Sequence, residues 1–261
     1  MIPKIIHYCW FGHNPLPKLA VKCIDSWKKF LPDYDIKEWN ESNFDVNIIP
    51  YVKEAYEAKK YAFVSDYARF WILYHYGGLY FDTDVEIIKN MDDIIARGPF
   101  MGRERDSKSG QATIGANPGL GLGVAPGLDL YKEILDFYES LHFRLDDGSL
   151  NLQTVVKYVT SILIKHGLKD RDEIQECAGL FVYPKEYFCP KFYDDFKICK
   201  TKNTVSIHHY AGSWQPIDIQ KDHKRAIFRR NHNIIYKTYY YIIVIPKLFF
   251  LRIYTSIRNK G

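Results

Sequence analysis

YGGLYFDTD, residues 76–84, places a glycine pair, a short apolar run and two acids in one segment. The glycine pair ends a helix, because the left-handed conformation of a helix cap favours glycine. The apolar run Leu79–Phe81 then predicts a short strand that leads directly into Asp82 and Asp84. Side chains alternate along a strand with a period of two, so we expect both carboxylates on one side.

The segment before the glycine pair, Tyr61–Tyr76, contains no other Gly or Pro and predicts one helix. Its aromatic residues recur at helical spacing and form a stripe that faces the core. A polar face with Ser65, Asp66 and Arg69 lies beside that stripe. Because the helix runs directly into the acidic pair, we expect Asp66 to accept sugar hydroxyls there and Arg69 to donate to phosphate. The alternative is a surface ion pair, which contributes less than about 1 kcal/mol.

The rest of the chain predicts an α/β fold. A strand at Ile2–Trp10, a helix at Leu19–Phe30 and a strand at Tyr34–Trp39 form a β-α-β start, in which strand ends point into a cleft. Residues 98–127 are rich in glycine without a phosphate-loop pattern, and we expect an irregular, mobile substrate loop there. Further helices are expected near 128–143 and 152–166, and further strands near 180–183 and 205–210.

Composition places limits on the class of protein. With 261 residues and 47% hydrophobic content, the chain can bury one sizeable core. Its five cysteines are odd in number and contain no C-x-x-C pair, which argues against a disulfide framework or a zinc knuckle and favours a reducing, cytoplasmic setting. The N-terminus lacks the pattern of a cleaved signal peptide. We therefore expect one catalytic domain over residues 1–220.

The basic charge of the chain lies in its C-terminal tail. Residues 221–261 contain ten Lys or Arg and one acid, a net charge of +9, whereas residues 1–220 contain 26 bases and 30 acids, a net charge of −4. The acidic body argues against nucleic-acid binding. Lys237, Pro246 and Lys247 interrupt the apolar part of the tail, so a transmembrane helix is not expected.

Two roles for this tail stay open. A basic, aromatic-rich helix lies readily at an anionic membrane surface, which would make the protein peripheral on the inner face of the cytoplasmic membrane. The alternative is a pair of helices that pack their aromatic face on the domain and leave the basic side chains in water.

The acidic pair indicates a divalent metal. Asp82 and Asp84 are hard oxygen donors that can share one Mg²⁺ or Mn²⁺ with a diphosphate, and the ion neutralises a leaving nucleoside diphosphate. An isolated D-x-D pair also occurs in phosphohydrolases, where Asp82 would be the nucleophile. A non-catalytic carbohydrate-binding protein is the other alternative.

Three separated blocks carry a resemblance to a known family. They are IPKIIHYCWFG at residues 2–12, SDYAR with YGGLYFDTD at 65–69 and 76–84, and HHYAGSW at 208–214. In this order they resemble glycosyltransferase family 32 and the DXD region shared with large glucosylating bacterial toxins. The resemblance implies a GT-A fold, a Rossmann-like mixed sheet flanked by helices, with retaining transfer and a metal that is usually Mn²⁺.

The resemblance also implies roles for single residues. The nucleotide-sugar site would be formed by Tyr8, Trp10, Ser65, Asp66, Arg69, Tyr80, Asp82, Ser213 and Trp214. The implied catalytic residues are Asp66, Arg69, Asp82 and Asp84. Asp82, Asp84 and one histidine would bind the metal. Neighbouring strand residues point to opposite faces, so only one of His208 and His209 reaches it, and we prefer His209.

The middle of the chain departs from the family pattern. Asn151–Val156 stands where yeast-type mannosyltransferases often have a Gly-Pro-containing segment on the acceptor side. The better resemblance is to bacterial capsular or O-antigen polysaccharide transferases. It implies a UDP-linked hexose or N-acetylhexosamine as donor, a glycan or lipid-linked oligosaccharide as acceptor, and attack by the acceptor hydroxyl from the side of the leaving phosphate.

Overall fold

The computed structural model describes residues 1–104, 115–194, 196–212, 215, 217–232 and 242. The chain divides into two compact units. The first comprises Met1–Tyr193 and Lys197–Trp214, and the second comprises Asp194–Phe196 and Gln215–Gly261. The boundary predicted after residue 220 lies within helix α8 (Ile217–Asn231) of the second unit.

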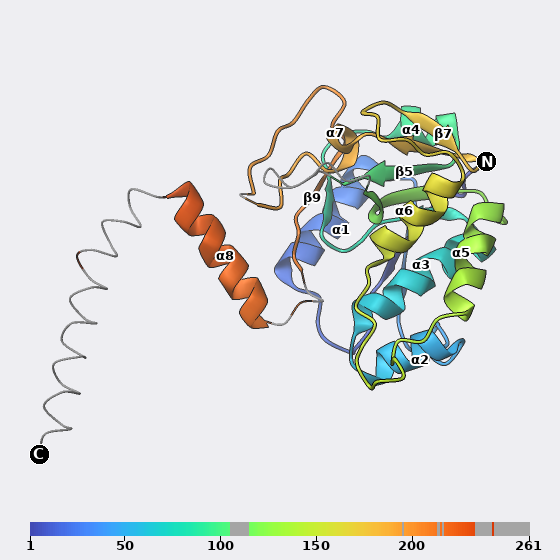
Figure 1. The fold of residues 1–261 in the computed structure, drawn as a ribbon. Helices are drawn as coiled ribbons and strands as arrows, with labels where there is room; N and C mark the ends of the chain where they lie inside the picture. The colour runs from blue at the N-terminus through green and yellow to red at the C-terminus, as the bar shows by residue number, and fades with distance from the viewer. Residues whose placement is uncertain (105–114, 195, 213–214, 216, 233–241, 243–261) are drawn as a thin grey trace, which may run out of the picture. The chain divides into compact units, whose positions relative to one another are not determined.

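A mixed seven-stranded sheet forms the centre of the first unit (Figure 1). Its strands, in the order in which they lie side by side, are β2 (Asp35–Trp39), β1 (Ile5–Cys9), β3 (Gly78–Tyr80), β6 (Ala116–Val124), β5 (Phe100–Arg103), β8 (Leu180–Tyr183) and β7 (Gln175–Cys177). The pairs β2–β1, β1–β3 and β5–β8 are parallel, and β6 and β7 run antiparallel to their neighbours. The resemblance implied a mixed sheet flanked by helices, and the structure has this arrangement.

A second, two-stranded sheet lies beside the large one. β4 (Val85–Ile87) follows the acidic pair and runs antiparallel to β9 (Ser206–His208). Sequence patterns predicted a strand for β9 but missed β4. This pairing brings His208 and His209 close to the segment that contains Asp82 and Asp84.

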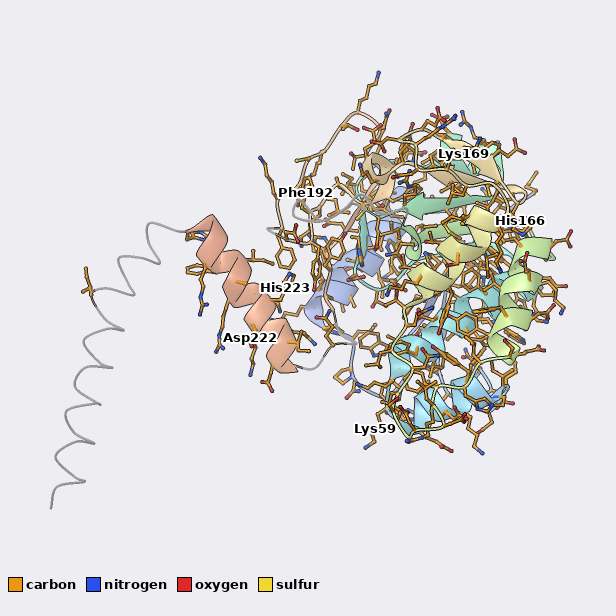
Figure 2. The ribbon with its side chains drawn as sticks, viewed as in Figure 1. Lys59, His166, Lys169, Phe192, Asp222 and His223 are labelled. Atoms are coloured by element: carbon orange, nitrogen blue, oxygen red, sulfur yellow. The ribbon has the colours of Figure 1, made fainter. Side chains whose placement is uncertain are left out.

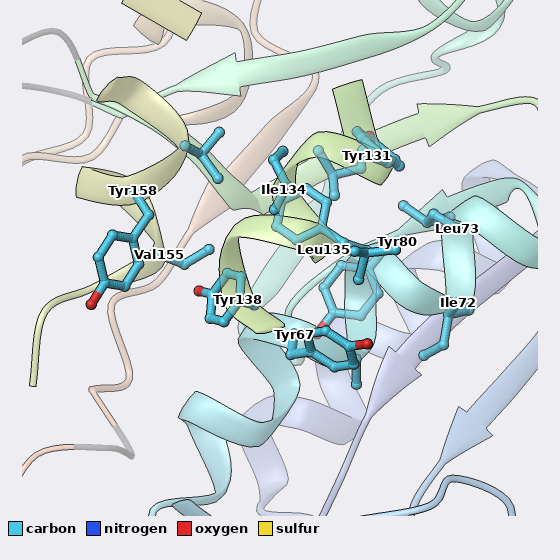
Figure 3. Packing of buried hydrophobic residues seen from close by; sticks show 14 of the residues in the cluster. Tyr67, Ile72, Leu73, Tyr80, Tyr131, Ile134, Leu135, Tyr138, Val155 and Tyr158 are labelled. Carbon is cyan, nitrogen blue, oxygen red and sulfur yellow. The ribbon is translucent and has the colours of Figure 1, made fainter. Parts of the chain in front are cut away.

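Helices cover both faces of the large sheet. Those of the first unit are α1 (Lys18–Phe30), α2 (Pro50–Glu57), α3 (Tyr61–Tyr76), α4 (Asp92–Arg97), α5 (Asp129–Glu139), α6 (Val155–Lys165) and α7 (Lys185–Phe188). α3 packs on α2 and α5, and α1 packs on β4. The buried side chains divide accordingly: Tyr80 belongs to the cluster under α3 and α5, and Leu79 to the cluster under α1. Figure 3 shows Tyr67, Tyr131 and Tyr138 in the first of these clusters.

The junction between α3 and β3 depends on glycine. Gly77 and Gly78 have φ angles of +63° and +99°, which disfavour other residues. A Cβ at Gly78 would also lie 2.6 Å from the carbonyl oxygen of Ile5 in β1. The predicted cap is confirmed, and it lets β3 lie directly against β1.

The buried side chain of His7 holds this junction through hydrogen bonds. Its Nε2 donates to the carbonyl oxygen of Gly77 at 3.0 Å, and its Nδ1 accepts from Trp39 Nε1 at 3.0 Å. The ring is therefore neutral, and burial lowers the pKa of His7 to about 4.

The glycine-rich segment shows where the sequence prediction was wrong. Residues 98–127 contain β5 and β6 rather than an irregular loop, and all nine residues of β6 are buried. Gly123 is needed because a Cβ there would overlap the ring of Phe100. The glycines of β6 thus serve close packing, which sequence patterns do not distinguish from flexibility. Residues 105–114 lie outside the described part of the chain.

The described part of the second unit is the basic helix α8. Lys221, Lys224 and Arg225 are exposed, as are the apolar side chains of Ile219 and Phe228. Figure 2 shows the side chains of α8, with Asp222 and His223 labelled. Among the described residues, no helix is long and apolar enough to cross a membrane. Apart from His232 and Ile242, the predicted tail beyond α8 lies outside the described residues.

Candidate functional site

Asp82 and Asp84 lie in a turn rather than on a strand. β3 ends at Tyr80 and β4 begins at Val85, whose backbone N–H donates to the carbonyl oxygen of Asp82 at 3.0 Å. The strand alternation that was expected to place both carboxylates on one side is therefore absent. The two acids contact different groups.

Asp82 belongs to a buried cluster with α3, which we call the α3 cluster: Asp66, Arg69, Tyr80 and Asp82. Arg69 Nη2 lies 2.8 Å from Asp66 Oδ1 and 3.3 Å from Asp82 Oδ1. The Tyr80 hydroxyl donates to Asp82 Oδ1 at 3.1 Å, and the guanidinium lies over the Tyr80 ring at 5.0 Å. Arg69 is only 2% exposed, so the alternative of a surface ion pair is wrong.

The backbone holds this cluster from two sides. Arg69 Nε donates to the carbonyl oxygen of Ser65 at 3.1 Å, while the Ser65 hydroxyl donates back to the Tyr61 carbonyl. The Asp66 carboxylate accepts the N–H of Val155 at the start of α6. Burial raises the pKa of Asp66 to about 7, although Arg69 opposes this rise. Arg69 Nη1 is buried and has no hydrogen-bond partner among the described residues.

Asp84 faces the other way, toward β9, in what we call the β9 cluster: Asp84, His208 and Ala211. Asp84 Oδ1 lies 3.3 Å from His208 Nε2, and Oδ2 accepts the backbone N–H of Ala211 at 2.8 Å. Burial alone would raise the pKa of Asp84, but His208 and this N–H outweigh it and lower the pKa to about 2. Burial alone would lower the pKa of His208, but Asp84 holds it well above its usual value.

His208, not His209, is the histidine that faces the acidic pair. The register places His208 opposite Val85, and the next side chain points away from Asp84. His209 Nε2 instead lies 2.7 Å from Glu86 Oε2, which also binds Lys22 Nζ at 2.8 Å. The preference for His209 is therefore corrected to His208. The sequence limited the choice to one of the two, but the choice depends on the register with the unpredicted β4.

Sequence patterns missed three residues beside Asp82. The backbone N–H of Asp82 donates to the carbonyl oxygen of Gly119 at 3.1 Å, and the Gly119 N–H donates to Asn117 Oδ1 at 2.8 Å. Asn117 Nδ2 donates in turn to Glu104 Oε2 at 3.0 Å. The only signal in the sequence is Asn-Pro-Gly at 117–119, which predicts a loop.

The remaining predicted residues are spread more widely. Tyr8 is 6% exposed, donates to Glu38 Oε2 at 2.6 Å and packs on Trp27, so it belongs to the core under α1. Trp10 is partly exposed at the end of β1, and its Nε1 donates to the carbonyl oxygen of Asn14 at 2.6 Å. Ser213 and Trp214 lie outside the described residues.

The β9 cluster offers part of a metal site. Two donors bound about 2.1 Å from one ion at right angles lie about 3 Å apart, close to the 3.3 Å between Asp84 Oδ1 and His208 Nε2. Within the part of the chain that the structure describes, no group of three or more His, Cys, Asp or Glu is arranged to hold a metal. Asp84 and His208 together supply two donors of kinds that bind divalent ions, and an ion held there would take its further ligands from a diphosphate or water. The Asp82 side chain, 32% exposed, is the most accessible of the three acids.

The family comparison agrees with this geometry. Residues 17–101 match the family described as the glycosyltransferase sugar-binding region containing the DXD motif. The matched segment includes Asp66, Arg69, Asp82 and Asp84 but ends before β9. This segment therefore resembles the DXD-containing sugar-binding region of glycosyltransferases, as its motifs indicated.

Curated relatives share part of this chain. Inositol phosphoceramide mannosyltransferase 1 of Schizosaccharomyces pombe is 31% identical over 38% of this chain and 33% of its own length. Inositol phosphoceramide mannosyltransferase 3 of the same yeast is 33% identical over 36% of this chain and 27% of its own length. The chain thus spans about a third of the length of these relatives. Among solved structures, the PaToxG glycosyltransferase is 20% identical, with a TM-score of 0.48 over 63% of this chain and 69% of its own.

Proposed function

We propose that this chain is a retaining glycosyltransferase that moves a sugar from a nucleotide-sugar donor to a glycan or lipid acceptor. The observation that carries the proposal is Arg69, buried between Asp66 and Asp82 with Nη1 left without a described partner. A buried arginine with a free donor is suited to a phosphate or sugar oxygen, because its planar fork binds such groups in fixed directions. The family match over residues 17–101 supports the same activity.

In this proposal, the β9 cluster binds the metal and the α3 cluster binds the nucleotide-sugar. Asp84 and His208 would hold a divalent ion, Mn²⁺ or Mg²⁺, which neutralises the leaving diphosphate when bound. Asp82 is proposed as a further ligand of this ion, with Arg69 and Tyr80 fixing its Oδ1. Asp66 would accept hydrogen bonds from hydroxyls of the transferred sugar, and Arg69 Nη1 would donate a hydrogen bond to the nucleotide-sugar. The phosphohydrolase alternative is less favoured, because residues 17–101 match a glycosyltransferase sugar-binding region.

The donor is proposed as a UDP-linked hexose or N-acetylhexosamine. The names of the yeast relatives make mannose a second candidate, although Asn151–Val156 departs from the mannosyltransferase pattern. No carboxylate stands out as a covalent nucleophile, so the acceptor hydroxyl would attack from the side of the leaving phosphate and retain the anomeric configuration. An NMR assay of the product tests this, and an inverted product contradicts it.

The acceptor and its location are part of the proposal. A bacterial surface glycan or a lipid-linked oligosaccharide fits the family resemblance, and the names of the yeast relatives contain a ceramide lipid. We place the enzyme on the cytoplasmic face of a membrane, with exposed Lys221, Lys224 and Arg225 of α8 against anionic lipid.

Vesicle binding tests the membrane contact. The full chain should co-sediment with vesicles that contain phosphatidylserine, and not with phosphatidylcholine alone. Changing Lys221, Lys224 and Arg225 to Glu should abolish this binding and leave activity on a soluble acceptor unchanged. Equal sedimentation of the variant and the wild type would remove α8 from the membrane proposal.

A donor panel tests the activity. The purified chain is incubated with Mn²⁺ or Mg²⁺ and UDP-linked glucose, galactose and N-acetylhexosamines or nucleotide-linked mannose, and nucleoside diphosphate release is followed. We expect one donor to be turned over by the wild type and by Glu133→Gln, a control at an exposed position of α5, but not by Asp84→Asn. If no donor releases nucleoside diphosphate and neither UDP nor GDP binds in a metal-dependent way, the proposed function is overturned.

A further inference from the structure

Asp82 is also held by residues outside the D-x-D motif. Glu104, Asn117 and Gly119 form a continuous chain of hydrogen bonds that ends on the backbone N–H of Asp82, and we call these three residues the Asp82 bracket. Glu104 follows β5, and the other two lie in β6, so the bracket is part of the sheet.

The bracket fixes the orientation of one buried amide. Asn117 is 8% exposed, and its Oδ1 accepts the Gly119 N–H at 2.8 Å while its Nδ2 donates to Glu104 Oε2 at 3.0 Å. A flipped amide would set Nδ2 against the Gly119 N–H and Oδ1 against the Glu104 carboxylate. Both contacts would then be lost in a buried place, so Glu104 selects one orientation of Asn117.

Gly119 leaves room for the Asp82 carboxylate. A Cβ built at Gly119 would overlap Asp82 Oδ2 and lie 3.1 Å from Asn117 Oδ1. The φ angle of Gly119 is outside the left-handed region, so the backbone itself does not require glycine there. The requirement comes from the aspartate. Asp82 Oδ2 is thus confined by Gly119 on one side, while Oδ1 is held by Arg69 and Tyr80 on the other.

We infer that Glu104, Asn117 and Gly119 are positioning residues that set the place of the Asp82 carboxylate and thereby the affinity for a metal-bound nucleoside diphosphate. The inference rests on the proposed function for its ligand, but the bracket itself is a property of the free protein. None of the three residues is assigned to touch the donor. They act through Asp82.

Exchanging the carboxylate of Glu104 and the amide of Asn117 tests the chain of hydrogen bonds. Asn117→Asp removes the donor Nδ2 and sets two carboxylates against each other, so the affinity for UDP or GDP with Mn²⁺ should fall about 10-fold. Glu104→Gln alone should change it less than about 3-fold, because the amide oxygen still accepts from Asn117. The double variant Glu104→Gln with Asn117→Asp restores a donor and an acceptor in reversed order, and should recover most of the lost affinity.

A pair of glycines on β6 gives the steric test. Gly119→Ala should displace Asp82, whose side chain is 32% exposed and can move, so the affinity for UDP or GDP with Mn²⁺ should fall about 10-fold while the unfolding midpoint changes little. Gly123→Ala is the matched control, because its Cβ overlaps the buried ring of Phe100 instead. It should lower the unfolding midpoint with little effect on affinity in the fraction that folds.

NMR of the metal-free protein separates this inference from the proposed function. The backbone amide and side-chain carboxyl resonances of Asp82 should shift in Asn117→Asp and Gly119→Ala, and should return toward wild type in the double exchange. Unmoved Asp82 resonances in both single variants would overturn the bracket. If the resonances move but the wild type binds neither UDP nor GDP with Mn²⁺, the bracket stands, and both its proposed effect on affinity and the proposed function fail.

Discussion

Asp82 and Asp84 are separated by one residue but belong to two different clusters of side chains. The α3 cluster joins Asp66 and Arg69 to Asp82 over a short stretch of chain, whereas the β9 cluster joins Asp84 to Ala211, 127 residues away. The side chains of Asp66 and Asp84 are 12% and 14% exposed, yet the pKa of Asp66 is raised to about 7 and that of Asp84 is lowered to about 2.

The difference lies in how each carboxylate is compensated. Asp66 shares a single guanidinium with Asp82, so burial outweighs the attraction of Arg69. Asp84 has the His208 ring and the Ala211 N–H as direct partners, and these outweigh its burial. The local cluster thus keeps a carboxylate that ionises with difficulty, and the long-range cluster keeps one fully ionised. In the proposed function, the first contacts a sugar hydroxyl and the second contacts a cation.

Removing the shared cation should break the α3 cluster with the largest effect on stability. Arg69→Met leaves Asp66 and Asp82 without their buried partner, so we expect the free energy of unfolding to fall by about 3–5 kcal/mol. Urea unfolding at neutral pH measures this loss. Asp66→Asn in the same chain should return part of it. A loss below about 1 kcal/mol would show that the pair contributes no more than a surface ion pair.

Acid should weaken the junction that supports the α3 cluster. His7 has a pKa of about 4 in the folded chain and 6.5 in the unfolded chain, so the unfolded state binds more protons between these values. Its stabilising contribution is complete above pH 6.5 and falls by about 3 kcal/mol as the pH drops toward 4. Urea unfolding at several pH values measures this. His7→Gln keeps a donor and an acceptor without titrating, and should show a flatter pH dependence. An unchanged pH dependence would contradict the neutral, buried ring.

The two histidines sharpen the account of the β9 cluster. His208→Gln should lower the affinity for Mn²⁺ in the presence of UDP or GDP about 10-fold or more, since it removes a donor beside Asp84. His209→Gln, the neighbouring control, should leave the affinity within about 2-fold, because this ring binds Glu86. Titration calorimetry compares the two. The opposite ranking would restore the original preference for His209.

The smallest effect belongs to one hydroxyl of the α3 cluster. Tyr80→Phe removes the donor to Asp82 Oδ1 and keeps the ring under Arg69. We expect a loss of about 1 kcal/mol in the free energy of unfolding, measured by urea unfolding. A similar loss in Tyr131→Phe, whose hydroxyl has no partner among the described residues, would mean that the measured effect is not specific to the Asp82 contact.

How much the sequence predicts also differs between the regions. Helix α3 was predicted at its observed bounds, and the approach of Asp66 and Arg69 to Asp82 followed, because the chain runs from the helix through a glycine cap into the acids. Local patterns were sufficient there. The β9 cluster depends on Val85–Ile87, a strand too short to show a period. The choice of His208 required its register.

The bracket was missed for a related reason. The glycines of β6 were interpreted as signs of flexibility, whereas Gly119 and Gly123 are needed because Asp82 and Phe100 occupy the space of a side chain. That requirement comes from residues far along the chain. Neither local propensity nor spacing contains it.

The most direct test of the account is a crystal structure of the chain with Mn²⁺ and the nucleoside diphosphate that it binds, with data collected at the manganese absorption edge. The account predicts one anomalous peak within about 2.3 Å of both Asp84 and His208 Nε2, with the diphosphate on the side of Asp82 and Arg69 Nη1. A peak at His209 and Glu86, with His208 still against Asp84, would contradict it.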